Sequence, residues 1–209
     1  MFSALLAYPL SVKTLPYRRQ ITFFVFFTML FNGGLVPTYL MYVNYFHIKN
    51  TIWALIIPNL LLSANNVLMI RSYFMTSIPE ALYEAAKIDG AGQLRIFAQI
   101  ILPISKPIIA TIALFAAFGY WNDWFQASLY ISDKNLQTLQ SMLNNIQNNI
   151  EYIANNPYGG LSLQQYKASM PTESVRMAIA IIIVVPIACV YPFFQKYFIS
   201  GLTIGSVKG

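Results

Sequence analysis

The chain has 209 residues, of which 57% are hydrophobic and only 10% are charged, and its mean hydropathy is positive. So little polar surface cannot cover a soluble globule, and the composition therefore argues for an integral membrane protein. The formal charge of +6 does not indicate nucleic-acid binding, because the basic residues are spread among loops and form no dense patch.

Long stretches without Asp, Glu, Lys or Arg mark where the chain can cross a bilayer as a helix of roughly 20 apolar residues. Four such stretches stand out, at residues 20–48, 50–70, 107–122 and 177–195. A shorter apolar piece, residues 1–12, resembles the end of a fifth crossing. Its basic residues follow the apolar run, so it does not match a secretion signal. We expect an all-α polytopic transmembrane bundle, with residues 1–209 forming a single domain.

Basic residues beside membrane helices are retained on the cytoplasmic side, so their distribution predicts the orientation of the chain. With the loop at residues 13–19 inside, alternation of the crossings also places inside Arg71, Lys87, Arg95, Lys106, Lys196 and Lys208. The basic residues left outside are fewer, namely Lys49, Lys134, Lys167 and Arg176. The C-terminus is therefore predicted to be cytoplasmic.

The first full crossing is longer than a bilayer requires, and its middle predicts a kink or a short interruption. Asn32, Gly33, Gly34 and Pro37 lie there, and such residues free backbone groups from the helix. Beyond them an aromatic cluster suits the outer interface, comprising Tyr39, Tyr42, Tyr45, Phe46 and His47.

Few residues of the chain have the chemistry of a metal or redox site. The single histidine, His47, is interpreted as a surface residue, because a lone interfacial histidine is seldom a ligand. The single cysteine, Cys189, permits no intramolecular disulfide and is interpreted as a packing residue. We expect no metal site.

Two sets of polar residues interrupt apolar stretches. Asn65 and Asn66 lie deep in the second full crossing, where unsatisfied amides are costly. They either line a polar path or form hydrogen bonds between helices, and we favour the second role. Asp123 follows the third crossing, and because a carboxylate at the bilayer centre costs about 2.5–3.5 kcal/mol, we expect it near the outer surface. Trp121 and Trp124 then act as interface anchors.

The inside loop at residues 77–103 predicts two short helices joined by a glycine turn. Ser77 and Glu80 have the spacing of a capping box, and Pro79 occupies a position that tolerates proline. The first helix then runs for two to three turns and stops at Gly90. The second is expected from about residue 91 to 102, ending at Pro103.

This loop has features of a docking element. Ala85 and Ala86 are small enough for close approach of a partner, and Glu84 and Asp89 can pair with basic groups. The alternative, an ordinary interfacial helix that connects two crossings, is equally well supported on physical grounds alone.

The outer loop, residues 130–172, contains an amphipathic segment. Its apolar residues recur at steps of three and four, at Leu136, Leu139, Leu143, Ile146, Ile150 and Ile153. We favour a helix lying on the outer face of the membrane domain over a docking surface for an extracellular partner. Turn residues then end it, at Asn156, Pro157, Gly159 and Gly160.

The inside loop resembles the cytoplasmic signature of ABC importer permeases. The match consists of Glu84-Ala85-Ala86, Asp89-Gly90-Ala91 and, after a gap, Leu102-Pro103. In that family the loop forms a coupling helix that sits in a cleft of the ATP-hydrolysing subunit. The resemblance implies that Glu84 faces a basic residue of the ATPase and that Gly90 forms the turn.

Three further segments resemble the carbohydrate branch of that family, which includes the maltose-type permeases. They are residues 31–39, the Trp121-Asn122-Asp123-Trp124 segment, and the C-terminal segment with Gly201, Gly205 and Lys208, which implies a tail reaching the ATPase dimer. The resemblance covers essentially the whole chain, although family members carry a further pair of helices ahead of it, so N-terminal helices of the family are apparently missing. It implies a multi-pass protein of the bacterial inner membrane.

The resemblance also implies a set of partners: a second permease subunit, an ABC ATPase dimer, an extracellular substrate-binding protein, the lipid bilayer and a sugar substrate. The chain has no Gly-rich loop ending in Gly-Lys-Ser or Gly-Lys-Thr, so we expect no cofactor here, with ATP and Mg²⁺ in the partner. Candidate path or gate residues are Asn65, Asn66 and the Trp121–Trp124 segment, whose polar side chains would bind sugar hydroxyls while an indole stacks on a ring.

Other functions are left open by the sequence. A permease for a peptide or an amino acid would carry the same cytoplasmic loop. A membrane-embedded enzyme is disfavoured, since the crossings hold no constellation of His, Cys and carboxylate residues. A passive scaffold would leave the cytoplasmic loop without a purpose.

Overall fold

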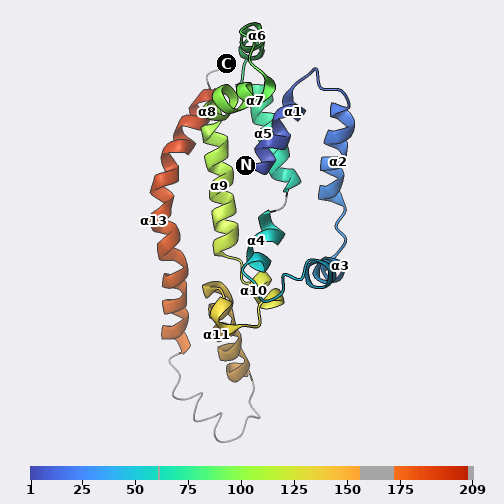
Figure 1. The fold of residues 1–209 in the computed structure, drawn as a ribbon. Coiled ribbons are helices and arrows are strands. Elements are labelled where there is room, and N and C mark those ends of the chain that lie inside the picture. Colours follow the sequence, from blue (N-terminus) through green and yellow to red (C-terminus); the bar gives the residue numbers. More distant parts are fainter. Residues whose placement is uncertain (61, 156–171, 207–209) are drawn as a thin grey trace, which may run out of the picture. The chain divides into compact units, whose positions relative to one another are not determined.

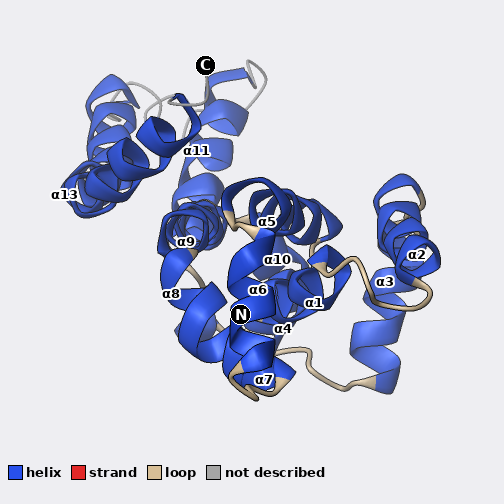
Figure 2. Cartoon of the chain, turned by 90° about the horizontal axis from the view of Figure 1, so that it is seen from above, coloured by secondary structure: helices blue, strands red, loops and turns tan. Residues whose placement is uncertain are grey.

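A computed structural model describes residues 1–60, 62–155 and 172–206, and these residues form helices and loops without any strand (Figures 1 and 2). The expected all-α class is therefore confirmed. The chain divides into two compact units, which are considered separately below. Unit 1 contains Met1–Thr38, Leu60–Ala116 and Phe193–Gly209, and unit 2 contains Tyr39–Asn59 and Ala117–Pro192.

By length and composition, the described residues contain between one and three membrane spans. Helix α13 (Thr172–Ser206) qualifies alone through its segment Ser174–Phe193. Two bent pairs of helices are further spans if each pair is counted as a single span. These pairs are Arg18–Leu30 with Leu35–Tyr45, and Gln93–Ile104 with Lys106–Trp121. The second helix of the latter pair is α9 (Lys106–Trp121), which matches the crossing predicted at residues 107–122 to within one residue at each end.

The crossing predicted at residues 50–70 is wrong as a single helix. Helix α4 (Trp53–Leu60) contains Pro58, and a second helix, α5 (Ala64–Ser77), begins only after Ser63. The backbone of Ser63 is extended, with ψ of 117°, which a continuous helix does not allow. Apolar composition therefore identified a hydrophobic segment here but not the break inside it.

The interruption predicted in the first crossing is confirmed. Helix α2 (Arg18–Leu30) ends before the Asn-Gly-Gly sequence, and α3 (Leu35–Leu40) begins directly after it. Gly34 has a φ of +90°, a conformation that side chains rarely adopt, and its N–H donates to Asn32 Oδ1 over 3.0 Å. A single π-helical turn, η1 (Met41–Tyr45), follows α3.

The core of unit 1 lies between α1 (Phe2–Ser11) and α5. Ala4 and Ala7 are almost fully buried, and their small side chains let α1 approach the face of α5 that carries Val67 and Phe74. Arg71 of α5 donates from Nε to the Leu10 carbonyl over 2.9 Å, which satisfies a backbone group near the end of α1. Helix α2 packs on the same pair less extensively and stands at the edge of the unit (Figure 2).

In unit 2 an aromatic core surrounds α10 (Phe125–Tyr130). Tyr130 is buried and stacks on Tyr39, with ring centroids 5.5 Å apart, and Tyr42 meets it edge to face. Asn50 joins the same region, since its Oδ1 accepts from the N–H groups of Ser132 and Asp133. The predicted aromatic cluster is thus divided, with Tyr42 in the core and residues such as Tyr45 exposed.

The amphipathic helix predicted within residues 130–172 is present as α11 (Leu139–Asn155), with Leu143 and Ile150 buried. Its predicted start is wrong, because Leu136 ends a separate 3-10 turn, η3 (Lys134–Leu136), before Gln137 becomes extended. The predicted turn residues Asn156, Pro157, Gly159 and Gly160 lie outside the described residues.

Candidate functional site

The loop singled out by sequence begins with α6 (Glu80–Ile88), at the end of unit 1 where α5 finishes (Figure 1). The predicted capping box is wrong, because Ser77 is the last residue of α5 and makes no cap to α6. Ile78 and Pro79 are extended instead, and Pro79 occupies the N-cap position. The buried Ile78 side chain anchors this turn in the core of unit 1.

The predicted glycine stop of α6 is confirmed. Gly90 has a φ of +76°, and its N–H donates to the Lys87 carbonyl over 3.0 Å. The Ala91 N–H donates to the Ala86 carbonyl over 2.9 Å, which satisfies a further carbonyl of the last turn. An L-residue at this φ would be strained, so the turn requires glycine.

The second helix of the loop begins and ends later than predicted. It consists of α7 (Gln93–Ile96), the π-turn η2 (Phe97–Ile101) and α8 (Leu102–Ile104). The expected end at Pro103 is wrong, because the helix continues past Pro103 to Ile104. The helix breaks at Ser105 and bends by 78° into α9.

One tyrosine of α1 contacts both helices of the loop at residues 77–103. Tyr8 is buried, and its Oη donates to Gln93 Oε1 over 2.8 Å. Its ring is stacked on Tyr83 of α6, at 6.3 Å between centroids, and lies 5.2 Å from that of Phe97. Sequence reasoning missed Tyr8 and Tyr83, and the only signal available was a tyrosine inside an otherwise apolar segment.

The loop before α2 provides a second attachment. Lys13 Nζ lies 2.5 Å from Glu80 Oε2, and both side chains are largely exposed, so this ion pair orients α6 more than it stabilises it. A cavity of about 360 Å³ lies beside the pair, lined among others by Lys13, Glu80 and Tyr83. Burial raises the pKa of the Tyr83 hydroxyl above its usual 10.0, although the nearby Ser11 hydroxyl opposes the shift.

The two faces of α6 have opposite characters. Ala86 is 5% exposed and packs into the core of unit 1, so it is not on the outward face. Ala85, Leu82 and Ile88 are exposed, with Ile88 at 86%. Glu84 and Asp89 are also exposed, and within the described residues neither forms an ion pair. The outward face therefore offers apolar and acidic groups to a partner.

The Trp121–Trp124 segment lies in unit 2, between α9 and α10. Trp121 Nε1 donates to the Ile183 carbonyl of α13 over 3.2 Å, and Asn122 Nδ2 donates to the Phe118 carbonyl over 2.9 Å. Asp123 Oδ1 accepts from the Gln126 N–H over 2.9 Å and so caps the first turn of α10. These contacts give the polar side chains structural roles, and contact with a solute stays a prediction.

The remaining predicted residues lie in several places. Asn65 and Asn66 are in the first turn of α5, with Asn65 exposed. Gly201 and Gly205 lie within α13, and Lys208 lies outside the described residues. No three His, Cys, Asp or Glu side chains gather anywhere in the described part of the chain.

Apolar helices long enough to cross a membrane, together with a short exposed helix at the end of unit 1, are features of a transporter's membrane subunit. The chain belongs to the family of binding-protein-dependent transport system inner membrane components, whose family model matches residues 1–204. The resemblance noted from the loop at residues 77–103 is thereby confirmed, and the chain is a transport permease.

Individual relatives agree with this membership. The chain is 41% identical to Protein LplC of Bacillus subtilis (strain 168) over all of its own length and 68% of that protein. It is 40% identical to the polygalacturonan/rhamnogalacturonan transport system permease protein YtcP of the same organism, over 99% of this chain and 70% of that one. Among solved structures, it resembles a bacterial ABC transporter involved in the import of the acidic polysaccharide alginate, with a TM-score of 0.73 and 29% identity over 95% of this chain and 70% of that one.

Proposed function

We propose that this permease forms half of the translocation path of an ATP-driven importer for a sugar or oligosaccharide. A separate ATPase dimer would dock on α6 and supply the energy. The observation that carries the proposal is the contrast between the faces of α6: the inner face shares a core with α1 and α5, while the outer face is exposed. A push on the outer face would therefore be transmitted directly to helices of the membrane domain.

The exposed residues have the chemistry of an interface. Ile88 is 86% exposed and Leu94 is 77% exposed, and burying one such side chain contributes about 1.5–3 kcal/mol. Glu84 adds a carboxylate without an ionic partner in the described chain, suited to a basic residue of the ATPase. Apolar anchors beside a charged group are what a specific docking site requires.

The distribution of basic residues supports a cytoplasmic position for the loop and the C-terminus. The basic residues predicted inside, from Lys13 to Lys208, fall in the ranges of unit 1, which also carries α6. Those predicted outside, including Lys49 and Lys134, fall in the ranges of unit 2. One compact unit thus carries both the excess of positive charge and the proposed ATPase site, as the positive-inside rule requires.

The carbohydrate substrate is inferred from the names of the relatives. YtcP is named for polygalacturonan and rhamnogalacturonan, and others are named for melibiose, raffinose and stachyose or for maltodextrin. These names span acidic and neutral saccharides but no peptide, which favours a sugar over the alternative solutes. An extracellular binding protein and a second permease subunit would complete the importer.

Cross-linking tests the docking of α6. Ile88→Cys, on a Cys189→Ser background, should cross-link to the ATPase through a reagent that joins a thiol to lysine amines. Glu151→Cys on α11 of unit 2 is an exposed control and should give no ATPase product. Equal cross-linking from both positions, or none from Ile88→Cys in an active complex, would refute the proposed site.

Transport in proteoliposomes tests the substrate class. The complete complex with its binding protein should accumulate a labelled oligosaccharide, acidic or neutral, when ATP is present on the ATPase side. It should not accumulate a peptide of similar size. ATP-dependent uptake of the peptide without any saccharide uptake would overturn the sugar assignment while leaving the permease role intact.

A further inference from the structure

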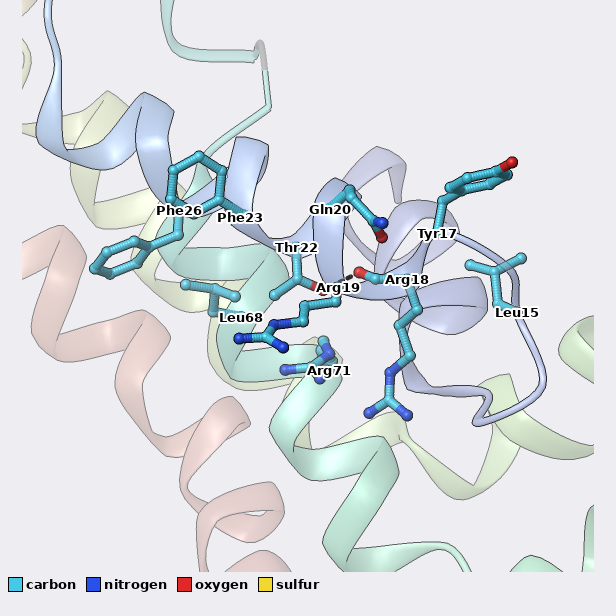
Figure 3. A pocket seen from close by; sticks show the side chains of 10 residues that line it. All are labelled: Leu15, Tyr17, Arg18, Arg19, Gln20, Thr22, Phe23, Phe26, Leu68 and Arg71. Atoms are coloured by element: carbon cyan, nitrogen blue, oxygen red, sulfur yellow. Dashed lines mark hydrogen bonds between the residues drawn. The ribbon is translucent and has the colours of Figure 1, made fainter.

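A cavity of about 700 Å³ opens in unit 1 between the start of α2 and the middle of α5 (Figure 3). Its lining is divided by chemistry. Three guanidinium groups contribute to it, from Arg18 and Arg19 of α2 and Arg71 of α5. Aromatic rings from Phe23 and Phe26 line it further along α2. The cavity is thus cationic where α2 begins and apolar beyond.

The three arginines line one cavity, and no carboxylate of the described residues lines it with them. Arg71 donates from Nε to the Leu10 carbonyl, and among the described residues the Arg18 side chain donates only to the sulfur of Met75, over 3.2 Å. The charges of Arg18 and Arg71 repel each other. Within the described residues none of the three forms an ion pair, since the acidic partner near this loop, Glu80, is bound to Lys13. An anion placed among them would relieve the repulsion and accept charge-assisted hydrogen bonds.

The order of groups along α2 matches the order of groups in a phospholipid. Phe23 follows Arg19 by four residues, which places its ring about 6 Å further along the helix axis at 1.5 Å per residue. Phe23 and Phe26 are both substantially exposed, as rings that contact acyl chains would be. A free phosphate would use the arginines and leave these rings without a role.

We propose that this cavity binds the phosphate headgroup of an anionic phospholipid from the leaflet nearest α6. The guanidinium groups of Arg18, Arg19 and Arg71 hold the phosphate, and Phe23 and Phe26 contact the upper acyl chain. Because these residues come from two helices, the lipid joins α2, at the edge of the unit, to α5, which leads into α6. Basic pockets between membrane helices have the chemistry for such headgroups.

Native mass spectrometry of the complete transporter complex tests this binding. Phosphatidylglycerol is the probe, and phosphatidylcholine, which is zwitterionic and has no net charge, is the comparison, each added to delipidated complex. Arg19→Gln should weaken phosphatidylglycerol retention roughly fivefold, and the triple change of Arg18, Arg19 and Arg71 to Gln should abolish it. The triple change to Lys should retain most of it. Arg95→Gln is the control, because Arg95 is exposed, lies outside the cavity and bonds to Gln99.

Several outcomes would overturn the proposal. Equal retention by the triple Gln variant and Arg95→Gln would show that the lipid binds elsewhere, and equal retention of both lipids would exclude charge recognition. If millimolar inorganic phosphate stabilised the delipidated complex as much as the lipid did, the site would be one for free phosphate. If the triple variant fails to assemble, Arg19→Gln alone tests the site. Arg19 makes no side-chain hydrogen bond within the described chain, so this single change should not disturb the fold. Unchanged binding in that variant would refute the site.

Discussion

The Tyr8 hydroxyl donates a 2.8 Å hydrogen bond to Oε1 of Gln93, 85 residues further along the chain. The same tyrosine is stacked on Tyr83, so a residue of α1 contacts both helices of the loop at residues 77–103. Tyr8 belongs to the core of unit 1 and Tyr83 packs against that core, whereas Gln93 is exposed and its bond to Tyr8 is partly buried. A displacement of the loop by an ATPase would therefore reach α1 without passing through the chain connection at Ile78.

Removing the Tyr8 hydroxyl should weaken this link while keeping the ring in place. We expect Tyr8→Phe to destabilise the folded chain by about 1 kcal/mol, because the bond to Gln93 is lost in a partly buried site. It should also increase the ATP consumed per solute imported, since the loop is held less firmly. Thermal unfolding of the purified complex and paired ATPase and uptake assays measure the two effects.

Tyr45→Phe is the matched control for this change. Tyr45 is 82% exposed in unit 2, so loss of its hydroxyl should alter neither the melting temperature nor the coupling ratio. Identical behaviour of the Tyr8 and Tyr45 variants would contradict the role given to Tyr8.

The turn after α6 gives a second prediction. Gly90 has a φ of +76° and no atom within 4 Å of where a Cβ would be, so Gly90→Ala introduces backbone strain and no collision. The expected cost is about 1–2 kcal/mol. Because the strain is relieved by reorienting α6, uptake should fall more than chain abundance in the membrane. Circular dichroism melts and uptake assays test the two parts.

Gly33→Ala is the control for Gly90→Ala, because it replaces a glycine by alanine at a position without backbone strain. Gly33 also has open space around its Cβ position, but its φ is not positive, so the same substitution should change stability by less than about 0.5 kcal/mol. A larger loss from Gly33→Ala than from Gly90→Ala would argue against the strained turn.

The sequence predicted the chemistry of the loop better than its geometry. The glycine turn at Gly90 was predictable because only glycine satisfies a left-handed cap cheaply. The start of α6 was not predictable. Ser77 and Glu80 have the spacing of a capping box, but Ser77 is the last residue of the preceding helix, α5. Local spacing cannot decide between two helices that both accept the same serine.

Long-range contacts were beyond sequence reasoning for a different reason. The attachments of Tyr8 to Gln93 and of Lys13 to Glu80 join residues 85 and 67 positions apart, and no periodicity records such pairs. The break at Ser63 was likewise hidden, because the whole stretch from residue 50 to 70 carries no charged residue. Composition predicts where a segment is hydrophobic, whereas the continuity of a helix depends on packing around it.

The outward carboxylate of α6 gives a third prediction. Glu84 is exposed and lies on the face proposed to meet the ATPase, so Glu84→Lys should place two positive charges against each other there. We expect ATP-driven uptake to fall at least tenfold, with normal insertion and little change in melting temperature. A second change, of the facing basic residue of the ATPase to Glu, should restore part of the uptake.

Glu151→Lys is the control for charge reversal, because Glu151 is exposed on α11 of unit 2. It should leave ATP-driven uptake near the unmodified level. Equal losses from both reversals would show that net charge, and not a contact of α6, is responsible.

The buried hydroxyl of Tyr83 predicts a dependence of stability on alkaline pH. Its pKa is raised above 10.0, chiefly because burial disfavours the phenolate. The folded chain therefore holds this proton more tightly than the unfolded chain does. The resulting stabilisation is complete below pH 10 and is lost as the pH rises through the raised pKa.

Tyr83→Phe should remove this loss, because phenylalanine has no proton to release and keeps the ring beside Tyr8. The difference in melting temperature between Tyr83→Phe and the unmodified complex should be constant from pH 8 to 9. Above pH 10 it should shift in favour of the variant. Tyr45→Phe, which removes an exposed hydroxyl, should show no such shift, and parallel curves for all three proteins would mean that ionisation of Tyr83 does not limit the stability of the loop.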